Sequence, residues 1–396
     1  MRTIGIICEC NPLHAGHLYL LERARADGAD AVIAVMSGCF VQRGEPAVTD
    51  PFTRAEILVR SGFDAVFELP FPYSASGSEF FGMAGVEILA RLGVDELWFG
   101  SECGDVSILS HLAEIADSTC FQQRYAETKQ SAGGTAQAYF DLLREFGGKE
   151  LPSLDPNDIL ALSYLRAIRK TGSRMRPVTV KRMGNGYRET VLGQGFPSAT
   201  ALRLLWREEG LGAVSDLLPP ACAELLEQAC ENGTAPASLE LMERAILSHF
   251  RLTPAMDLEQ IAELGGGLGA RMAQLSHASA TLESFLSLCA TKKYTDARLR
   301  RGILFALTGI RQEDLRRSVA YARLLSANKT GCEFLSSIRK TSSIPVVTRQ
   351  TDLPDCEDAK RAFDLECRSR ALFTLCTPAA SSAERLIRRT PVIVDR

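Results

Sequence analysis

The chain has 396 residues, 46% of them hydrophobic and 23% charged, with a formal net charge of −3. This length predicts two or three domains, and the composition is that of a globular enzyme. Apolar runs end after five or six residues, which excludes a membrane-spanning helix. A strand pattern stands at the N-terminus in place of the basic and long apolar segments of a secretory leader, so we expect a cytoplasmic protein without a membrane partner.

The 12 cysteines are scattered and form no Cys-x-x-Cys pair. Their spacing argues against a disulfide framework, and the histidines lie away from paired cysteines, which argues against zinc. We therefore expect reduced, mostly buried thiols and no metal held by the protein alone. Any metal would be Mg²⁺ that arrives with a nucleotide.

Strand and helix patterns alternate over residues 1–210. Continuous apolar runs predict strands buried on both faces, at Thr3–Cys8, Ala31–Met36, Ala65–Leu69 and Glu96–Gly100. Helices and one edge strand are predicted at His17–Asp27, Thr53–Ser61, Glu79–Leu92, Ser107–Asp117, Ala136–Phe146, Asn157–Thr171, Pro177–Lys181 (the strand) and Ser198–Glu209. This alternation is typical of an α/β domain with a doubly wound parallel sheet, as in Rossmann-like folds.

Residues 211–396 predict a mainly helical second domain, because Leu- and Ala-rich amphipathic segments dominate. The expected helices are Ala221–Cys230, Leu239–Phe250, Ala270–Cys289, Asp296–Thr308 and Gln312–Leu325, and two minor strands are expected at Ile344–Thr348 and Pro391–Val394.

The sequence His14-Ala15-Gly16-His17 follows the first strand and precedes a helix. Ligands of a parallel α/β sheet bind at such a junction. Two imidazoles three residues apart can both face nucleotide phosphates, and the free N–H groups of the first helical turn add donors. We expect His14 and His17 to stabilise the charge that grows on ATP during adenylyl transfer. The alternatives are a chance His-x-x-His in a loop and a metal-binding pair.

A second candidate anion site opens a later helix. Pro197 blocks a helix upstream, Ser198 is a good N-cap, and Thr200 and Arg203 follow within the first turns. The alternative is a capped helix with a solvated arginine.

Two further segments follow strands. Gly100, within Phe99–Glu102, would let a base or ribose come close, unless the segment is an ordinary turn. The loop Ser37–Pro46 is a candidate contact for phosphate or an acyl substrate, and a candidate lid over the site. Glu68 ends the third strand, where its side chain could face the same crevice. For the loop and for Glu68 the alternative is a structural role.

Positive charge gathers between Thr281 and Pro345, where 12 Lys or Arg face 5 Asp or Glu. Tyr294 would offer a stacking surface among cations, as in RNA-binding proteins, although a charge run can also be a solvated helix face. The candidate RNA-binding residues are Lys292, Lys293, Tyr294, Arg298 and Arg301.

Several common site motifs are absent from the sequence. It contains no GxxxxGK[ST] and no GxGxxG after the first strand, which excludes a P-loop and a dinucleotide fingerprint. It also lacks a GxSxG elbow and an HExxH helix.

The His14–His17 box and the Ser198–Arg203 segment resemble the HxGH nucleotidyltransferase superfamily. Within it, the chain most resembles the bacterial tRNA(Met) cytidine acetate ligase family. The stretches that carry this resemblance are Gly5–His17, Val35–Ala47, Phe67–Pro70, Phe99–Glu102, Pro156–Leu160, Val180–Gly184 and Lys293–Thr295. The chain departs from the family at Leu13, where Phe is common, and at Cys39, where Asn is common.

The resemblance implies an enzyme that activates acetate with ATP as acetyl-adenylate. The acetyl group then passes to the exocyclic amine of the wobble cytidine in elongator tRNA(Met). His14 and His17 would be the catalytic residues. Contacts to ATP would come from Ile7, Cys8, Glu9, Cys10, Asn11, Pro12, Leu13, His14, Ala15, Gly16, His17, Leu18, Tyr19, Leu20, Gly100, Asn157, Arg182, Ser198, Thr200 and Arg203.

Two other functions share parts of this pattern. A small-molecule adenylyltransferase would use the same box and Ser/Thr-Arg segment, but it would leave the basic second domain without a purpose. A nucleotide-binding RNA adaptor would bind ATP without turnover.

Overall fold

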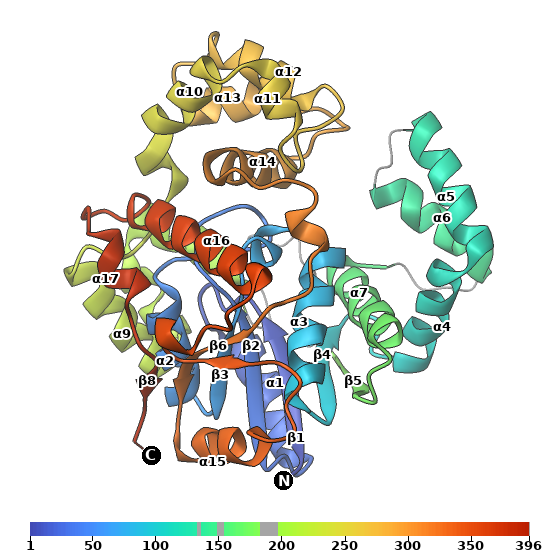
Figure 1. Ribbon diagram of the computed structural model, residues 1–396, viewed down its shortest axis with the longest axis vertical. Coiled ribbons are helices and arrows are strands. Elements are labelled where there is room, and N and C mark those ends of the chain that lie inside the picture. Colours follow the sequence, from blue (N-terminus) through green and yellow to red (C-terminus); the bar gives the residue numbers. More distant parts are fainter. Residues whose placement is uncertain (133–135, 149–153, 183–196, 396) are drawn as a thin grey trace.

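An eight-stranded sheet lies at the centre of the computed structural model, which describes residues 1–132, 136–148, 154–182 and 197–395 (Figure 1). The strand order is β5-β4-β1-β2-β3-β6-β7, and β8 also pairs with β6. Every pair is parallel except β3 with β6. The strands are β1 Thr3–Cys8, β2 Ala31–Ser37, β3 Ala65–Leu69, β4 Glu96–Ser101, β5 Arg176–Lys181, β6 Ala322–Ala327, β7 Val346–Val347 and β8 Val392–Ile393.

Two hydrophobic cores cover the two faces of the sheet, because successive side chains of a strand point to opposite faces. Ile4 and Ile6 of β1 join the core beneath α1 and α2, whereas Ile7 joins the core beneath α3 and α7. The helices of this part are α1 Ala15–Ala26, α2 Pro51–Arg60, α3 Ser78–Leu92, α4 Val106–Asp117, α5 Thr119–Ala132, α6 Ala136–Gly147, α7 Pro156–Thr171 and α8 Ala199–Glu209.

A helical unit follows α8, and α10–α14 stand together at the top of Figure 1. Its buried side chains belong to the same core as the α1–α2 face of the sheet. The remaining helices are α9 Pro220–Glu231, α10 Glu243–Leu252, α11 Ala255–Glu259, α12 Leu268–Ser276, α13 Leu282–Cys289, α14 Asp296–Thr308, α15 Lys329–Ile338, α16 Glu357–Thr374 and α17 Ala383–Ile387.

Most predicted elements are confirmed within two residues, but the predicted helix Gln312–Leu325 is wrong. Its last four residues belong to β6, which pairs antiparallel with β3 and is buried along its whole length. The Leu- and Ala-rich sequence favours a helix locally, and pairing with β3 overrides that preference. Because β6, β7 and β8 complete the sheet, the predicted division into 1–210 and a helical 211–396 does not describe the last 75 or so residues.

Two smaller differences concern helix boundaries. The predicted helix Ala270–Cys289 is broken into α12 and α13, because Thr281 caps α13 by accepting the Ser284 N–H at 3.1 Å. Helix α5, with its polar sequence, was not predicted.

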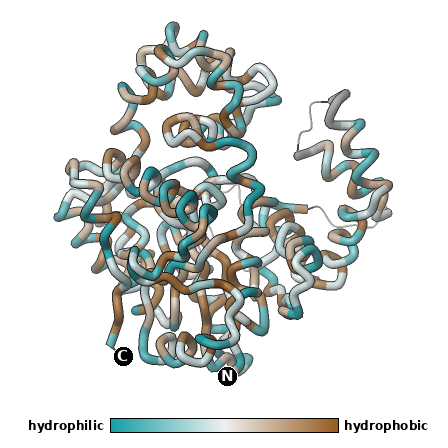
Figure 2. Tube along the Cα trace, viewed as in Figure 1, coloured by the Kyte–Doolittle hydropathy of each residue, from teal (hydrophilic) through white to brown (hydrophobic). Residues whose placement is uncertain are grey.

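Hydrophobic segments, brown in Figure 2, gather in the interior where the strands lie. Among the described residues, no helix combines the length and the apolar character that crossing a membrane requires.

Candidate active site

A cavity of about 290 Å³ opens at the carboxyl ends of β1, β4 and β5. Strand β1 lies between β2 and β4, so the chain leaves β1 toward one side of the sheet and returns to β4 from the other. Such a reversal of strand order creates a crevice at the strand ends, where ligands of doubly wound sheets bind. The fold therefore places the His14–His17 box at the crevice that the sheet provides.

The two histidines are held by the first turn of α1. His14 is the N-cap, and its Nδ1 accepts the Gly16 N–H at 3.0 Å. His17 Nδ1 accepts the His14 N–H at 3.3 Å, which closes a capping box. A neutral imidazole whose Nδ1 accepts must carry its proton on Nε2. Both rings can therefore donate an Nε2–H bond to a ligand, and their centroids lie 4.1 Å apart.

Both imidazoles are neutral in the protein without ligand. Burial, followed by Arg182 and Arg203, lowers the pKa of His14 to about 4. Burial and the neighbouring His14 hold the pKa of His17 well below its ordinary value. The histidines thus act as neutral hydrogen-bond donors at pH 7, and the positive charge of the site resides on its arginines.

Three helix N-termini converge on this cavity. Gly16 and His17 of α1, Asn157 of α7, and Ser198 and Thr200 at the start of α8 all line it. The first N–H groups of a helix have no partner within the helix and carry a partial positive charge. Their convergence makes the cavity suited to a polyphosphate or a similar anion.

Basic side chains add full positive charge to the cavity, which is lined by Arg43, Lys181, Arg182 and Arg203. Arg203 Nη1 donates to the backbone carbonyl of Asn11 at 2.8 Å, which ties the start of α8 to the segment before the histidine box. Arg182 follows β5, and its Nε lies 3.6 Å from Glu102 Oε1. The same Glu102 oxygen accepts a hydrogen bond from the Asn157 amide at 2.5 Å. The strand ends and helix starts are thus cross-linked around the cavity.

Aromatic side chains form another part of the wall. Phe81, Phe99 and Tyr164 line the cavity, and the Phe99 and Tyr164 rings lie 5.7 Å apart. Among the described residues, the buried Tyr164 hydroxyl and the Asn11 Nδ2 have no hydrogen-bond partner. A buried donor without a partner is costly. Both groups are therefore ready to donate to a bound ligand.

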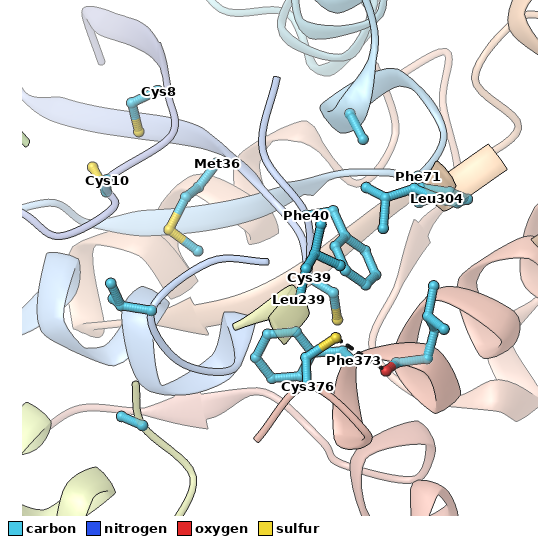
Figure 3. Packing of buried hydrophobic residues seen from close by; sticks show 14 of the residues in the cluster. Cys8, Cys10, Met36, Cys39, Phe40, Phe71, Leu239, Leu304, Phe373 and Cys376 are labelled. Carbon is cyan, nitrogen blue, oxygen red and sulfur yellow. Dashed lines mark hydrogen bonds between the residues drawn. The ribbon is translucent and has the colours of Figure 1, made fainter. Parts of the chain in front are cut away.

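The loop Ser37–Pro46 is a packed wall of the cavity. Cys39, Phe40 and Val41 are buried, and Figure 3 shows Cys39 and Phe40 packed against Phe373 at the end of α16. Within the loop, the Gly44 N–H donates to the Val41 carbonyl at 2.8 Å. This packing and hydrogen bonding indicate that the loop is a fixed wall that shields the site. They argue against the movable lid that the sequence suggests.

Arg54 of α2 anchors the loop Ser37–Pro46 through its guanidinium group. Its guanidinium is 1% exposed and donates to the carbonyls of Glu9 and Ser37, both at 2.8 Å, and to that of Gly38. On the cavity side, Glu9 Oε1 accepts the Gln42 N–H at 2.8 Å. Arg54 therefore sets the separation of the two chain segments that leave β1 and β2.

Known proteins are similar to this chain in sequence and in fold. A family model described as HIGH Nucleotidyl Transferase matches residues 1–386. The tRNA(Met) cytidine acetate ligase of Syntrophotalea carbinolica is 33% identical, with 97% of this chain and 96% of that protein aligned. That of Caldicellulosiruptor saccharolyticus is 36% identical over 86% of each chain.

This chain belongs to the tRNA(Met) cytidine acetate ligase family. Two crystal structures of the Thermotoga maritima member, TmcAL, superpose on it over the full length of both chains. The apo form has a TM-score of 0.93 at 31% identity, and the form bound with alpha-thio ATP has 0.90 at 32% identity.

Most of the residues predicted to contact ATP line the cavity. They are Ile7, Cys8, Glu9, Cys10, Asn11, His14, Gly16, His17, Tyr19, Leu20, Gly100, Asn157, Arg182, Ser198, Thr200 and Arg203. Pro12, Leu13, Ala15 and Leu18 do not line it. Leu13 is 1% exposed and belongs to the core on the α1 side of the sheet. Met183 and Gly184, which also support the family resemblance, lie outside the described residues.

Sequence reasoning missed Phe81, Leu160 and Tyr164 as lining residues. Each lies on α3 or α7 at a position whose apolar spacing reads as ordinary helix core. Only the packing of α3 beside α7 turns these side chains toward the strand ends.

The prediction that Glu68 faces the crevice is wrong. Glu68 is 4% exposed, and its Oε2 lies 2.8 Å from Arg370 Nη2 of α16. Glu366 and Arg323 extend this buried network, with Arg323 Nε 2.6 Å from Glu366 Oε1. A buried carboxylate requires such partners. Glu68 thus ties β3 to the C-terminal helix and lines neither large cavity.

The predicted RNA-binding residues fall into two groups. Lys292 and Lys293 are exposed. Tyr294 is only 9% exposed, its hydroxyl donates to the Gly266 carbonyl at 3.2 Å, and it offers no open stacking surface. Arg298 and Arg301 lie on one face of α14 as predicted, but both pair with Glu263. Much of the local positive charge is therefore balanced within the protein.

Among the residues that the structure describes, no cluster of three or more His, Cys, Asp or Glu side chains is arranged to hold a metal ion.

Proposed function

We propose that this protein is an ATP-dependent ligase that joins acetate to the exocyclic amine of the wobble cytidine in elongator tRNA(Met). The observation that carries the proposal is the cavity with two neutral imidazole donors, three helix N-termini and three arginines. Family members bear the corresponding name, and the Thermotoga maritima protein binds an ATP analogue within the same fold.

In the proposed first step, a carboxylate oxygen of acetate attacks the α-phosphorus of ATP. The bond to the β-phosphate oxygen breaks, acetyl-adenylate forms and pyrophosphate leaves. Negative charge grows on the phosphates, where His14 and His17 donate their Nε2–H bonds and Arg182 and Arg203 supply positive charge. Positioned donors of this kind suffice for transfer at phosphorus.

The proposal includes Mg²⁺ as an ion that arrives bound to the ATP phosphates. The cavity lining offers Glu9 as its carboxylate, and that side chain is engaged with the Gln42 N–H. An ion held chiefly by phosphate oxygens and water fits this lining, since Mg²⁺ in nucleotide sites keeps few protein ligands.

In the second step, the cytidine amine attacks the acetyl carbon and AMP leaves. We expect the base to leave its stack to reach the site, as in other enzymes that act on a base. Lys292 and Lys293 are the exposed members of the predicted RNA-binding set and would contact phosphates of the tRNA. A tRNA acceptor places the reaction in the cytoplasm.

The test is incorporation of labelled acetate into bulk tRNA, with and without ATP, by the wild type and His14→Ala. We expect ATP-dependent label in tRNA that falls at least about 100-fold in the variant, because one preorganised donor to the transition state is lost. Absence of label from the wild-type reaction, with ATP still bound, would refute the proposal.

A further inference from the structure

A second and larger cavity, of about 740 Å³, lies beside the first. We call it the outer cleft. Helix α8 forms one wall through Trp206 and Arg207, and α13 and α14 of the helical unit form another, with Ser287 and Arg300 among their lining residues. Its volume is that of a site for a small organic molecule or a single nucleotide.

The first cavity, lined by the His14–His17 box, is called the adenylate cavity below. It shares one residue and one wall with the outer cleft. Arg203 lines both. The segment Gln42–Pro46 separates them, with Gln42 and Arg43 lining the adenylate cavity and Glu45 and Pro46 lining the outer cleft. The two cavities are therefore adjacent at Arg203, and Glu45 lies on the wall between them.

Glu45 stands on this wall between two arginines. Its Oε2 lies 3.6 Å from Arg203 Nη2, and its Oε1 lies 3.9 Å from Arg300 Nε. Both distances exceed that of a hydrogen bond, so the two arginines leave the carboxylate oxygens able to accept from a ligand. The side chain is 27% exposed, within the lining of the cleft.

The wall that carries Glu45 is held rigidly against the helical unit. Gly44 has a φ of 75°, and a methyl group there would lie 2.7 Å from the Arg300 carbonyl carbon. The loop thus meets the α14 backbone directly, and Arg301 Nη1 donates to the Gln42 carbonyl at 3.4 Å. The helical unit and the adenylate cavity are fixed relative to each other through this contact.

We propose that the outer cleft receives the acceptor base and that Glu45 is the carboxylate that faces its amine. This inference rests on the proposed function. A cytosine edge offers an amine donor beside two acceptor atoms, and carboxylates are the usual partners of that amine. A cleft that mixes arginines with Glu45 and Glu240 suits such an edge better than it suits a phosphate.

In the transfer step, the amine nitrogen bonds to the acetyl carbon, and the bond from that carbon to the phosphate oxygen breaks, so AMP leaves with the electron pair. The nitrogen becomes positively charged during the attack. Glu45 takes its proton and passes it to water. Because the attacking nitrogen is a strong acid once it carries the positive charge, a weakly basic carboxylate is sufficient.

The experiment measures two reactions on each purified full-length variant: acetate-dependent exchange of labelled pyrophosphate into ATP, and acetyl transfer to tRNA. Glu45→Gln keeps the shape of the side chain, and Ser287→Trp fills the outer cleft from an exposed position. The control is Asp117→Asn. Asp117 is also paired with two arginines and is 31% exposed, but it lies on α4 away from both cavities.

We expect the ratio of transfer to exchange to fall at least about 100-fold in Glu45→Gln. It should fall clearly in Ser287→Trp and stay at the wild-type value in Asp117→Asn. A ratio unchanged in Glu45→Gln and Ser287→Trp overturns the inference. So does an equal loss of both reactions, since Glu45 would then serve the adenylate cavity. A wild type without acetate-dependent exchange refutes the proposed function itself, which is a different result.

Discussion

Replacing His14 by Asn separates the two properties of this side chain, capping a helix and taking up a proton. Asn is a favoured N-cap residue, so His14→Asn keeps an acceptor for the Gly16 N–H. It has no group that titrates. The variant therefore isolates the effect of the imidazole on the pH dependence of stability.

The size of the stability loss at low pH follows from the lowered pKa of His14. Burial, together with Arg182 and Arg203, places the pKa of His14 at about 4, whereas an imidazole in an unfolded chain titrates near about 6.5. Between these values the unfolded chain binds a proton that the folded chain does not, so stability falls as the pH drops through this window. At a pH of about 5 the loss from this one group is roughly 2 kcal/mol, and above about pH 7 it is nearly absent.

The assay is urea unfolding followed by tryptophan fluorescence at pH values of about 7.5 and 5. We expect the wild type to lose roughly 2 kcal/mol more than His14→Asn between the two conditions. The carboxylates titrate in both proteins, so their contributions cancel. Replacing His14 also lifts the pKa of His17, which makes the loss of the variant smaller and enlarges the difference in the same direction. Equal losses in the two proteins would show that His14 is not held neutral, and a larger loss in the variant would reverse the sign of the argument.

Three further substitutions test the parts that surround the site. Gly44→Ala should lower the free energy of unfolding by more than Gly266→Ala does. Both glycines have left-handed backbones, in which an alanine costs about 1–2 kcal/mol, but only Gly44 also abuts α14. Equal losses in urea titrations would argue against that docking contact. Ser198→Ala should lower the free energy of unfolding by about 1 kcal/mol and raise the KM for ATP, because α8 loses its N-cap. Ser198→Asn should restore both values. An unchanged KM in Ser198→Ala would show that this helix start does not contact ATP. Arg54→Met should lower the free energy of unfolding by at least about 3 kcal/mol in the same assay, because the buried carbonyls after β1 and β2 lose their donor. A loss below about 1 kcal/mol would contradict the anchoring role of Arg54.

The first four strands and the histidine box could be predicted from the sequence because their signals are local. A run such as Ala31–Ser37 is buried on both faces and reads as a parallel strand without further context. Ser198 is a good N-cap residue, and the His14–His17 box stands between a strand pattern and a helix pattern, so the sequence predicts both segments at helix starts.

The features that were missed depend on contacts between distant segments. Strand β6 is defined by its pairing with β3, some 260 residues away, and its own residues favour a helix. Tyr164 reads as core until α7 packs beside α3. Glu68 turns from the crevice because Arg370, 302 residues later, pairs with it. Local spacing cannot reveal such partners.

The most direct test of acetate activation at this site follows the oxygen atoms. The reaction uses acetate labelled with heavy oxygen in its carboxylate, together with ATP and tRNA, and AMP is analysed by mass spectrometry. Attack on the α-phosphorus makes an acetate oxygen the bridge of the acetyl-adenylate, and that oxygen leaves with AMP when the acetyl group is transferred. We predict one heavy oxygen in AMP for each acetyl group found in tRNA. Unlabelled AMP, or ADP and phosphate as products, would contradict activation through an acetyl-adenylate.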